Sequence, residues 1–133
     1  MFTTVAVVGA GTMGQGIAQL LIEAGLTVRF YDLSPDALSD AVDAVTRRLQ
    51  RRANRSTAAR AASGALLPAA SMSHLADADL AIEAVPERFE LKRDVFDELD
   101  RQLEPAAVLA SNTSCLDIDA LARASARPQR VVG

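Results

Sequence analysis

The feature that most constrains the fold is a glycine-rich turn between two apolar runs near the amino terminus. Residues 3–8 form an apolar run typical of a buried strand, and residues 9–14 (GAGTMG) follow it with the spacing G-x-G-x-x-G. A helical pattern separates this turn from a second apolar run, residues 26–31, which ends at Asp32. This order of strand, tight turn, helix and strand predicts the first unit of a parallel α/β sheet.

Each glycine of the fingerprint has its own steric role. Gly9 permits the tight turn out of the strand, Gly11 lets the main chain approach a diphosphate, and Gly14 lets the helix pack against the strand. The free N–H groups and the dipole at the start of that helix favour a bound anion. The sequence therefore predicts a dinucleotide site, and its candidate cofactor-binding residues here are Gly9, Gly11, Thr12, Met13 and Gly14.

The helix after the turn is predicted to bury one apolar face and to stop at Gly25. The predicted buried face consists of Met13, Ile17, Leu20, Leu21 and Ala24.

Asp32 lies at the distance from the fingerprint expected for an acid that accepts the adenosine ribose hydroxyls. A carboxylate at this position would repel a 2′-phosphate, so NAD is favoured over NADP. The structural alternative is that Asp32 caps the next helix, but Ser34 and Pro35 already supply a cap and a proline at the first helical position.

Length and composition agree with one small α/β domain over residues 1–133, with little room for a second. The net charge of −3 does not suggest a nucleic-acid or membrane partner, and no metal site is predicted. The lone cysteine, Cys115, excludes an internal disulfide and is consistent with the cytoplasm. No signal-peptide pattern or bilayer-spanning apolar run is present.

The rest of the chain alternates helices and strands. An amphipathic helix is predicted from Pro35 to about Arg52, and a shorter one over 54–64 would complete a helical hairpin after the second strand. The predicted fold is a Rossmann-type doubly wound parallel sheet of order 3-2-1-4-5-6 with this insertion. The remaining predicted elements are strands at 66–72, 80–85, 108–110 and 130–132, and helices from Glu87 and over 117–124.

Two groups of charged residues on these helices favour a structural interpretation. Arg93 and Asp97 are predicted to form an exposed i,i+4 pair of minor value. The arginines at 47–60 fit a solvated helix end better than a basic arm that meets a phosphorylated substrate, because charge runs are usually solvated surfaces.

Four stretches together resemble the amino-terminal NAD-binding domain of the L-3-hydroxyacyl-CoA dehydrogenase family, which includes 3-hydroxybutyryl-CoA dehydrogenases. They occur in the family's order and spacing along nearly the whole chain, which makes them far more specific than the fingerprint alone. The matching stretches are residues 7–18 (VVGAGTMGQGIA), Tyr31-Asp32, residues 78–92 (with ADLAIEAVPE and LK) and residues 109–114 (LASNTS).

The resemblance assigns roles to three further residues. It implies that Glu87 and Lys92 contact the cofactor, and that Ser114 lies near the nicotinamide and the substrate oxygen, as a catalytic residue. The structural alternatives are a helix first-turn charge for Glu87, an exposed helix lysine for Lys92 and a turn-stabilising side chain for Ser114. The cofactor-binding set at the later strand ends is Ala84, Val85, Glu87, Lys92, Asn112 and Ser114.

Two departures from the family pattern matter. Cys115 stands where the family often has serine, and we expect it to pack rather than to react. The family's His-Phe-Phe-Asn-Pro segment, which carries the general base, and its helical carboxyl-terminal domain, which completes the acyl-CoA site and usually the dimer, are expected to be missing here. His74 matches no family catalytic position and is predicted to be a surface or loop-packing residue.

Two hypotheses from different classes follow. The resemblance implies the NAD-binding part of an enzyme of fatty acid metabolism that oxidises an L-3-hydroxyacyl-CoA or acyl-carrier thioester and is not active alone. Alternatively, the chain is a noncatalytic dinucleotide-binding module or half of a split enzyme; among enzymes, the runner-up is a related β-hydroxyacid dehydrogenase. Arg48 and Arg55 are further candidates for contacts with coenzyme A, outside the predicted set.

Overall fold

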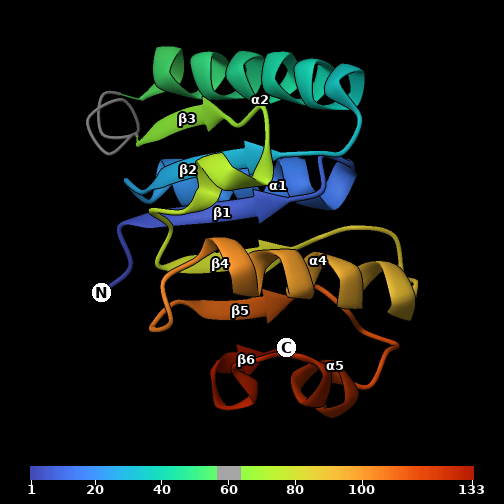
Figure 1. Ribbon diagram of the computed structural model, residues 1–133. Helices are drawn as coiled ribbons and strands as arrows, with labels where there is room; N and C mark the ends of the chain where they lie inside the picture. The colour runs from blue at the N-terminus through green and yellow to red at the C-terminus, as the bar shows by residue number, and fades with distance from the viewer. Residues whose placement is uncertain (57–63) are drawn as a thin grey trace.

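Parallel strands form the centre of the molecule in the order β3-β2-β1-β4-β5-β6, which confirms the predicted topology (Figure 1). The computed structural model describes residues 1–56 and 64–133. Neighbouring strands pair in parallel register, as in Val8 opposite both Tyr31 and Glu83. The strands are β1 (Thr4–Val8), β2 (Thr27–Tyr31), β3 (Ala65–Pro68), β4 (Leu80–Glu83), β5 (Val108–Ser111) and β6 (Val131–Val132).

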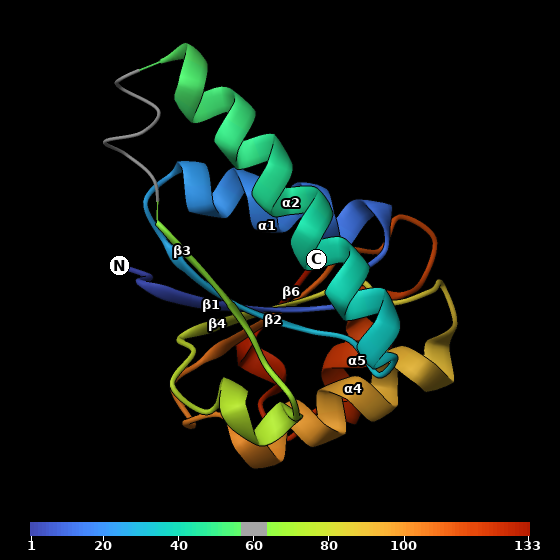
Figure 2. The ribbon, with the colours of Figure 1, turned by 90° about the horizontal axis from the view of Figure 1, so that it is seen from above.

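Helices cover both faces of this sheet, as parallel strands require. Seen from above, α1 (Thr12–Glu23) and α2 (Pro35–Arg55) lie on one side, and α4 (Phe89–Gln102) and α5 (Ile118–Ala124) on the other (Figure 2). The short 3₁₀ segment η1 (Met72–Leu75) lies beside α4, and a second, η2 (Pro128–Arg130), leads into β6. The molecule is therefore a helix–sheet–helix sandwich.

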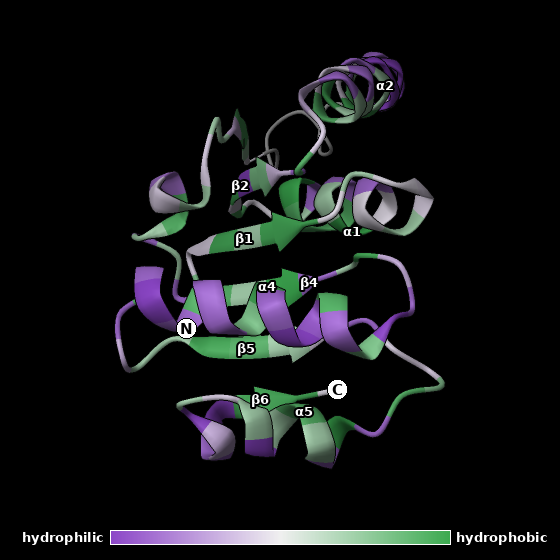
Figure 3. Cartoon of the chain, turned by 45° about the vertical axis from the view of Figure 1, so that its right-hand side comes forward, coloured by the Kyte–Doolittle hydropathy of each residue, from purple (hydrophilic) through white to green (hydrophobic). Residues whose placement is uncertain are grey.

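The central strands are apolar on both faces because each face is covered by helices. In β1, Val5 and Val7 pack toward α1 and α2, whereas Ala6 and Val8 pack toward α4 and α5. All four residues are fully or almost fully buried. Figure 3 shows this pattern: the central strands are largely hydrophobic, and the helices on either side of them carry polar residues on their outer surfaces.

The predicted buried face of α1 is partly correct: Ile17 and Leu21 are half-buried and pack against the core, whereas its other three members face solvent. Met13 and Leu20 are 58% and 69% exposed, whereas Gly14, Ala18 and Ile22 are buried. The physical reason is Gly14, whose added Cβ would lie 1.7 Å from the carbonyl oxygen of Gly9. Only a glycine allows this contact, so it fixes the side of α1 that faces the sheet.

Several predicted boundaries also shift. The helix predicted to end near Arg52 continues to Arg55, and its predicted partner over 54–64 falls largely on residues 57–63, outside the described residues. The third strand ends at Pro68, an edge-strand residue; the N–H of Ala69 still donates to the carbonyl of Phe30 at 2.8 Å, and η1 follows from Met72. The fourth strand ends at Glu83 rather than at residue 85, and α4 begins at Phe89, two residues after Glu87.

Two smaller findings concern the surface. Arg93 pairs with Asp94 at 3.5 Å instead of with Asp97, so the predicted i,i+4 pair is wrong. In the described ranges, no helix has the length and apolar character needed to cross a membrane.

Candidate functional site

The carboxyl ends of four neighbouring strands bring the predicted site residues to one edge of the sheet. The backbone N–H of Gly9 donates to the carbonyl of Tyr31 at 2.9 Å, and that of Ala84 donates to Val8 at 2.7 Å. The N–H of Asn112 donates to the carbonyl of Glu83 at 2.8 Å. Because these bonds continue the parallel pairing past the strand ends, the turns after β1, β2, β4 and β5 lie side by side.

The glycine turn combines close packing on one side with open space on the other. Gly9 has φ +112°, and its added Cβ would lie 2.5 Å from the carbonyl oxygen of Ala84. Gly11 is the N-cap of α1, with no side-chain cap, and an added Cβ there would meet nothing within 4 Å. The open space beside this helix N-terminus fits a diphosphate, whose oxygens could accept hydrogen bonds from the N–H groups of the first helical turn.

The Asp32 side chain links the glycine turn to the start of α2. Its Oδ2 accepts from the N–H of Ala10, and its Oδ1 accepts from the N–H of Ser34, both at 2.8 Å. Ser34 itself caps α2, because its Oγ accepts from the N–H of Ala37 at 3.2 Å. Asp32 is therefore not the helix cap, and each of its oxygens keeps capacity for a hydroxyl donor.

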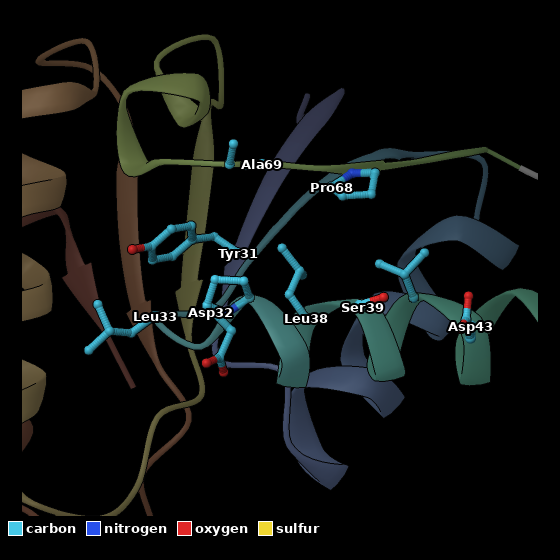
Figure 4. A pocket seen from close by; sticks show the side chains of 11 residues that line it. Tyr31, Asp32, Leu33, Leu38, Ser39, Asp43, Pro68 and Ala69 are labelled. Carbon is cyan, nitrogen blue, oxygen red and sulfur yellow. The ribbon is translucent and has the colours of Figure 1, made fainter.

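Two grooves adjoin Asp32. One, of about 600 Å³, lies between the glycine turn and the start of α4. Its largely apolar wall includes Leu33, Val85 and Leu91, which suits the flat face of an aromatic base. The other, of about 380 Å³, lies between α2 and the segment after β3, and there the Asp32 carboxylate points away from Pro68 and Ala69 (Figure 4).

A buried polar cluster lies beneath the turns after β4 and β5. Glu83 and Lys92 are fully buried, and Lys92 Nζ lies 2.5 Å from Glu83 Oε2. The same Oε2 accepts from the N–H of Val85 at 2.8 Å, and Oε1 accepts from the hydroxyl of Ser111. The resemblance places Lys92 against the cofactor, yet its side chain has no exposed surface. Its ammonium also donates to the carbonyl of Val85 at 3.0 Å.

Glu83 is not among the functional residues predicted from the sequence. The available signal was an acid at the end of an apolar strand, because a buried carboxylate is costly without a partner. The partner could not be identified from the pattern, since a lysine on an amphipathic helix is usually exposed.

Glu87 joins this cluster to the turn after β5. The hydroxyl of Thr113 donates to Glu87 Oε1 at 2.5 Å, and Lys92 Nζ lies 3.5 Å from the same oxygen. The hydrogen bond from Thr113 lowers the pKa of Glu87 below its ordinary value, and the charge of Lys92 lowers it further. Glu87 is thus held as a carboxylate between the two turns.

The turn itself presents Asn112 and Ser114 to solvent. The Ser114 hydroxyl lies 3.7 Å from Cys115 Sγ, and both residues are exposed, so the expectation that Cys115 packs is wrong. The reason is that the turn projects beyond the end of the sheet. His74 is exposed within η1, as predicted for a surface residue, and does not belong to these turns.

The sheet order, the glycine turn and Asp32 together define the class: a Rossmann-type dinucleotide-binding domain. Residues 4–133 match the family described as "3-hydroxyacyl-CoA dehydrogenase, NAD binding domain". The chain belongs to this family.

Individual relatives agree with the family. The 3-hydroxyadipyl-CoA dehydrogenase of Escherichia coli is 41% identical over 135 aligned residues, which cover 98% of this chain and 28% of that protein. A probable 3-hydroxybutyryl-CoA dehydrogenase of Bacillus subtilis is 38% identical and is matched over 96% of this chain and 46% of its own length. The crystal structure of 3-hydroxybutyryl-CoA dehydrogenase from Escherichia coli superposes on this chain with a TM-score of 0.89 at 38% identity. The match covers 98% of this chain and 29% of the chain in that crystal structure. The chain therefore spans less than half the length of these relatives.

Proposed function

We propose that this chain binds NAD at the carboxyl edge of its sheet and acts in hydride transfer between NAD and an L-3-hydroxyacyl thioester. The observation that carries the proposal is the junction of an open glycine turn with an anchored acid. Gly11 leaves the helix N-terminus uncovered, and the carboxylate of Asp32 is bonded to both Ala10 and Ser34. One surface thus offers donors to a diphosphate and acceptors to a ribose.

The groove beside Asp32 supports a specific orientation for the dinucleotide. Its apolar wall, with Leu33 and Val85, would receive the adenine ring, while Asp32 accepts the hydroxyls of the attached ribose. Thr12, Met13 and Gly14, together with Gly9 and Gly11, would then surround the diphosphate. The nicotinamide half is directed toward Ala84, Glu87 and the turn that holds Asn112 and Ser114.

We propose that Ser114 acts on the substrate oxygen. Its exposed hydroxyl can donate to the carbonyl, or accept from the alcohol, of a 3-oxo or 3-hydroxy thioester. NAD, when bound, supplies the hydride acceptor, and the serine contributes orientation of the reacting carbon. The proton of the hydroxyl group requires a base, and we expect a histidine outside these 133 residues to provide it.

The substrate and partner assignments rest on the relatives. The names 3-hydroxyadipyl-CoA and 3-hydroxybutyryl-CoA dehydrogenase support an acyl-CoA substrate, with an acyl-carrier thioester as the variant. The greater length of these relatives supports a further carboxyl-terminal domain. From the family resemblance, we propose that this domain is helical, completes the acyl site and forms a homodimer. A cytoplasmic location is part of this proposal, and the free Cys115 is consistent with it.

Cofactor preference tests the role of Asp32. Isothermal titration should show that the unaltered protein binds NADH and that Asp32→Arg shifts its preference toward NADPH, because the arginine attracts the 2′-phosphate that the carboxylate repels. Asp36→Arg is the matched control, since Asp36 carries the same charge in the first turn of α2 and lines neither groove. Unchanged selectivity in Asp32→Arg would contradict this role, and no NADH binding at all would overturn the proposed function.

A further inference from the structure

The buried pair of Glu83 and Lys92 connects the two turns that the proposed function places beside the nicotinamide. Through its side chain, Glu83 holds the N–H of Val85 in the turn after its own strand and the hydroxyl of Ser111 at the end of the next strand. Through its carbonyl, it holds the N–H of Asn112. One residue therefore contacts both sides of the gap between the ends of β4 and β5.

Lys92 completes the connection from α4. Its ammonium contacts Glu83 and the carbonyl of Val85, and it lies 3.5 Å from Glu87. Glu87 in turn accepts from the hydroxyl of Thr113 on the far turn. The contacts run continuously from Ser111 through Glu83, Lys92 and Glu87 to Thr113, so the backbone of each turn is fixed relative to the other.

Fold stability alone gives little reason for such a pair. Removing two charges from water costs free energy, and apolar residues of similar volume are often as stable in their place. The side chains of this pair instead join the two sides of the site: they hold the main chain of Val85 in the first turn and the hydroxyl of Ser111 at the start of the second. A buried, bonded pair also moves little, which suits groups that keep turns at a fixed spacing.

We propose that Glu83 and Lys92 are positioning residues that set the spacing of the turns at 84–88 and 112–114, and thereby control how tightly the nicotinamide ring of NAD is held. This inference rests on the proposed function. Lys92 contributes by holding Glu83, Glu87 and the carbonyl of Val85, and a variant that leaves Lys92 in place separates this role from a direct contact of Lys92 with the cofactor. The adenine half, held by the glycine turn and Asp32, lies outside the control of the pair.

Two ligands that differ only at the nicotinamide end give a selective test. NADH carries the nicotinamide ring, and ADP-ribose is the same molecule without that ring. The variant is the double substitution Glu83→Gln with Lys92→Met, which keeps side-chain volume and leaves no unpaired buried charge. We expect the dissociation constant for NADH, measured by isothermal titration, to rise about tenfold, and that for ADP-ribose to change by less than about twofold.

A second variant and a control separate positioning from general weakening. Ser111→Ala keeps the ion pair and removes one donor to Glu83, so it should weaken NADH binding by about threefold in the same direction. It also serves if the double variant does not fold. The matched control is Arg127→Met with Asp100→Asn, which removes another nearly buried ion pair, joined to α4 near its carboxyl end. This control should leave the ratio of the two dissociation constants unchanged.

The outcomes distinguish this inference from the proposed function. Positioning is supported if the dissociation constant for NADH, divided by that for ADP-ribose, rises in both site variants and not in the control. Equal losses for both ligands, no loss for either, or a selective loss confined to the double variant would overturn positioning while NAD binding stands. If the unaltered protein binds neither ligand, the proposed function falls and this inference falls with it.

Discussion

At the residue scale, Gly14 and Gly16 lie in the same helix and have opposite surroundings. An added Cβ on Gly14 would lie 1.7 Å from the carbonyl oxygen of Gly9, and 2.8 Å from its carbon. An added Cβ on Gly16 would meet nothing within 4 Å. The first glycine is therefore required by the contact between helix and turn, whereas no atom of the described structure would clash with a side chain at the second.

Substituting each glycine with alanine should change stability in opposite directions. Gly14→Ala should lower the free energy of unfolding by more than about 2 kcal/mol, because the clash involves backbone atoms that cannot move independently. Gly16→Ala should raise it by about 0.5–1 kcal/mol, since alanine loses less entropy in a helix. Urea unfolding followed by circular dichroism measures both values, and an equal effect of the two substitutions would contradict the fixed orientation of α1.

At the element scale, α4 is held at each end by a buried charge. Lys92 ties its first turns to the site, and Arg127, in the segment between α5 and η2, ties its carboxyl end to the loop before β5. The Arg127 Nε donates to Asp100 Oδ1 at 2.8 Å, and its other nitrogens donate to backbone carbonyls. Those carbonyls belong to Asp100, Leu103, Glu104 and Ala107.

Losing Arg127 should therefore be costly for α4. Arg127→Met leaves the Asp100 carboxylate nearly buried without its cation, and the free energy of unfolding should fall by about 3–5 kcal/mol. The exposed Arg123, 3.9 Å from Asp117, is the control, and Arg123→Met should change stability by less than about 1 kcal/mol. Urea titration of both variants tests this difference. Similar decreases in the free energy of unfolding would mean that the Arg127 network is exposed to solvent.

At the scale of the whole molecule, the parallel sheet separates binding groups from stabilising ones. Parallel strands end at one edge, so the turns with Gly11, Asp32 and Ser114 face a common ligand surface. The Arg127 network lies near the opposite end of α4 and contacts none of these turns. The single histidine of the sequence, His74, belongs to η1 and not to the turns at this edge.

The 133-residue protein should consequently bind NADH without turning it over. Addition of acetoacetyl-CoA should cause almost no loss of NADH absorbance, because a general base or acid contributes about 10²–10⁴-fold to such reactions. His74→Ala should leave this residual rate unchanged. Robust turnover by the unaltered protein would show that a residue within this chain performs the proton transfer.

Local patterns in the sequence determined the element order, the strand topology and the residues at the ligand edge. The glycine spacing and the position of Asp32 depend on contacts close in sequence, and the parallel order follows from the alternation of helices and strands. Asp32 and the glycines lie where the fingerprint predicts. Their role toward NAD remains a prediction until binding is measured.

Only the tertiary structure decided which groups are buried and with whom they pair. Met13 and Leu20 fit an apolar face by periodicity, but the contact of Gly14 with Gly9 turns them outward. Lys92 fits a solvent-exposed helix position, yet Glu83, nine residues earlier, removes it from water. Pairing depends on how β4, β5 and α4 pack in three dimensions, and a linear pattern contains no such distances, so the buried cluster emerged only from the fold.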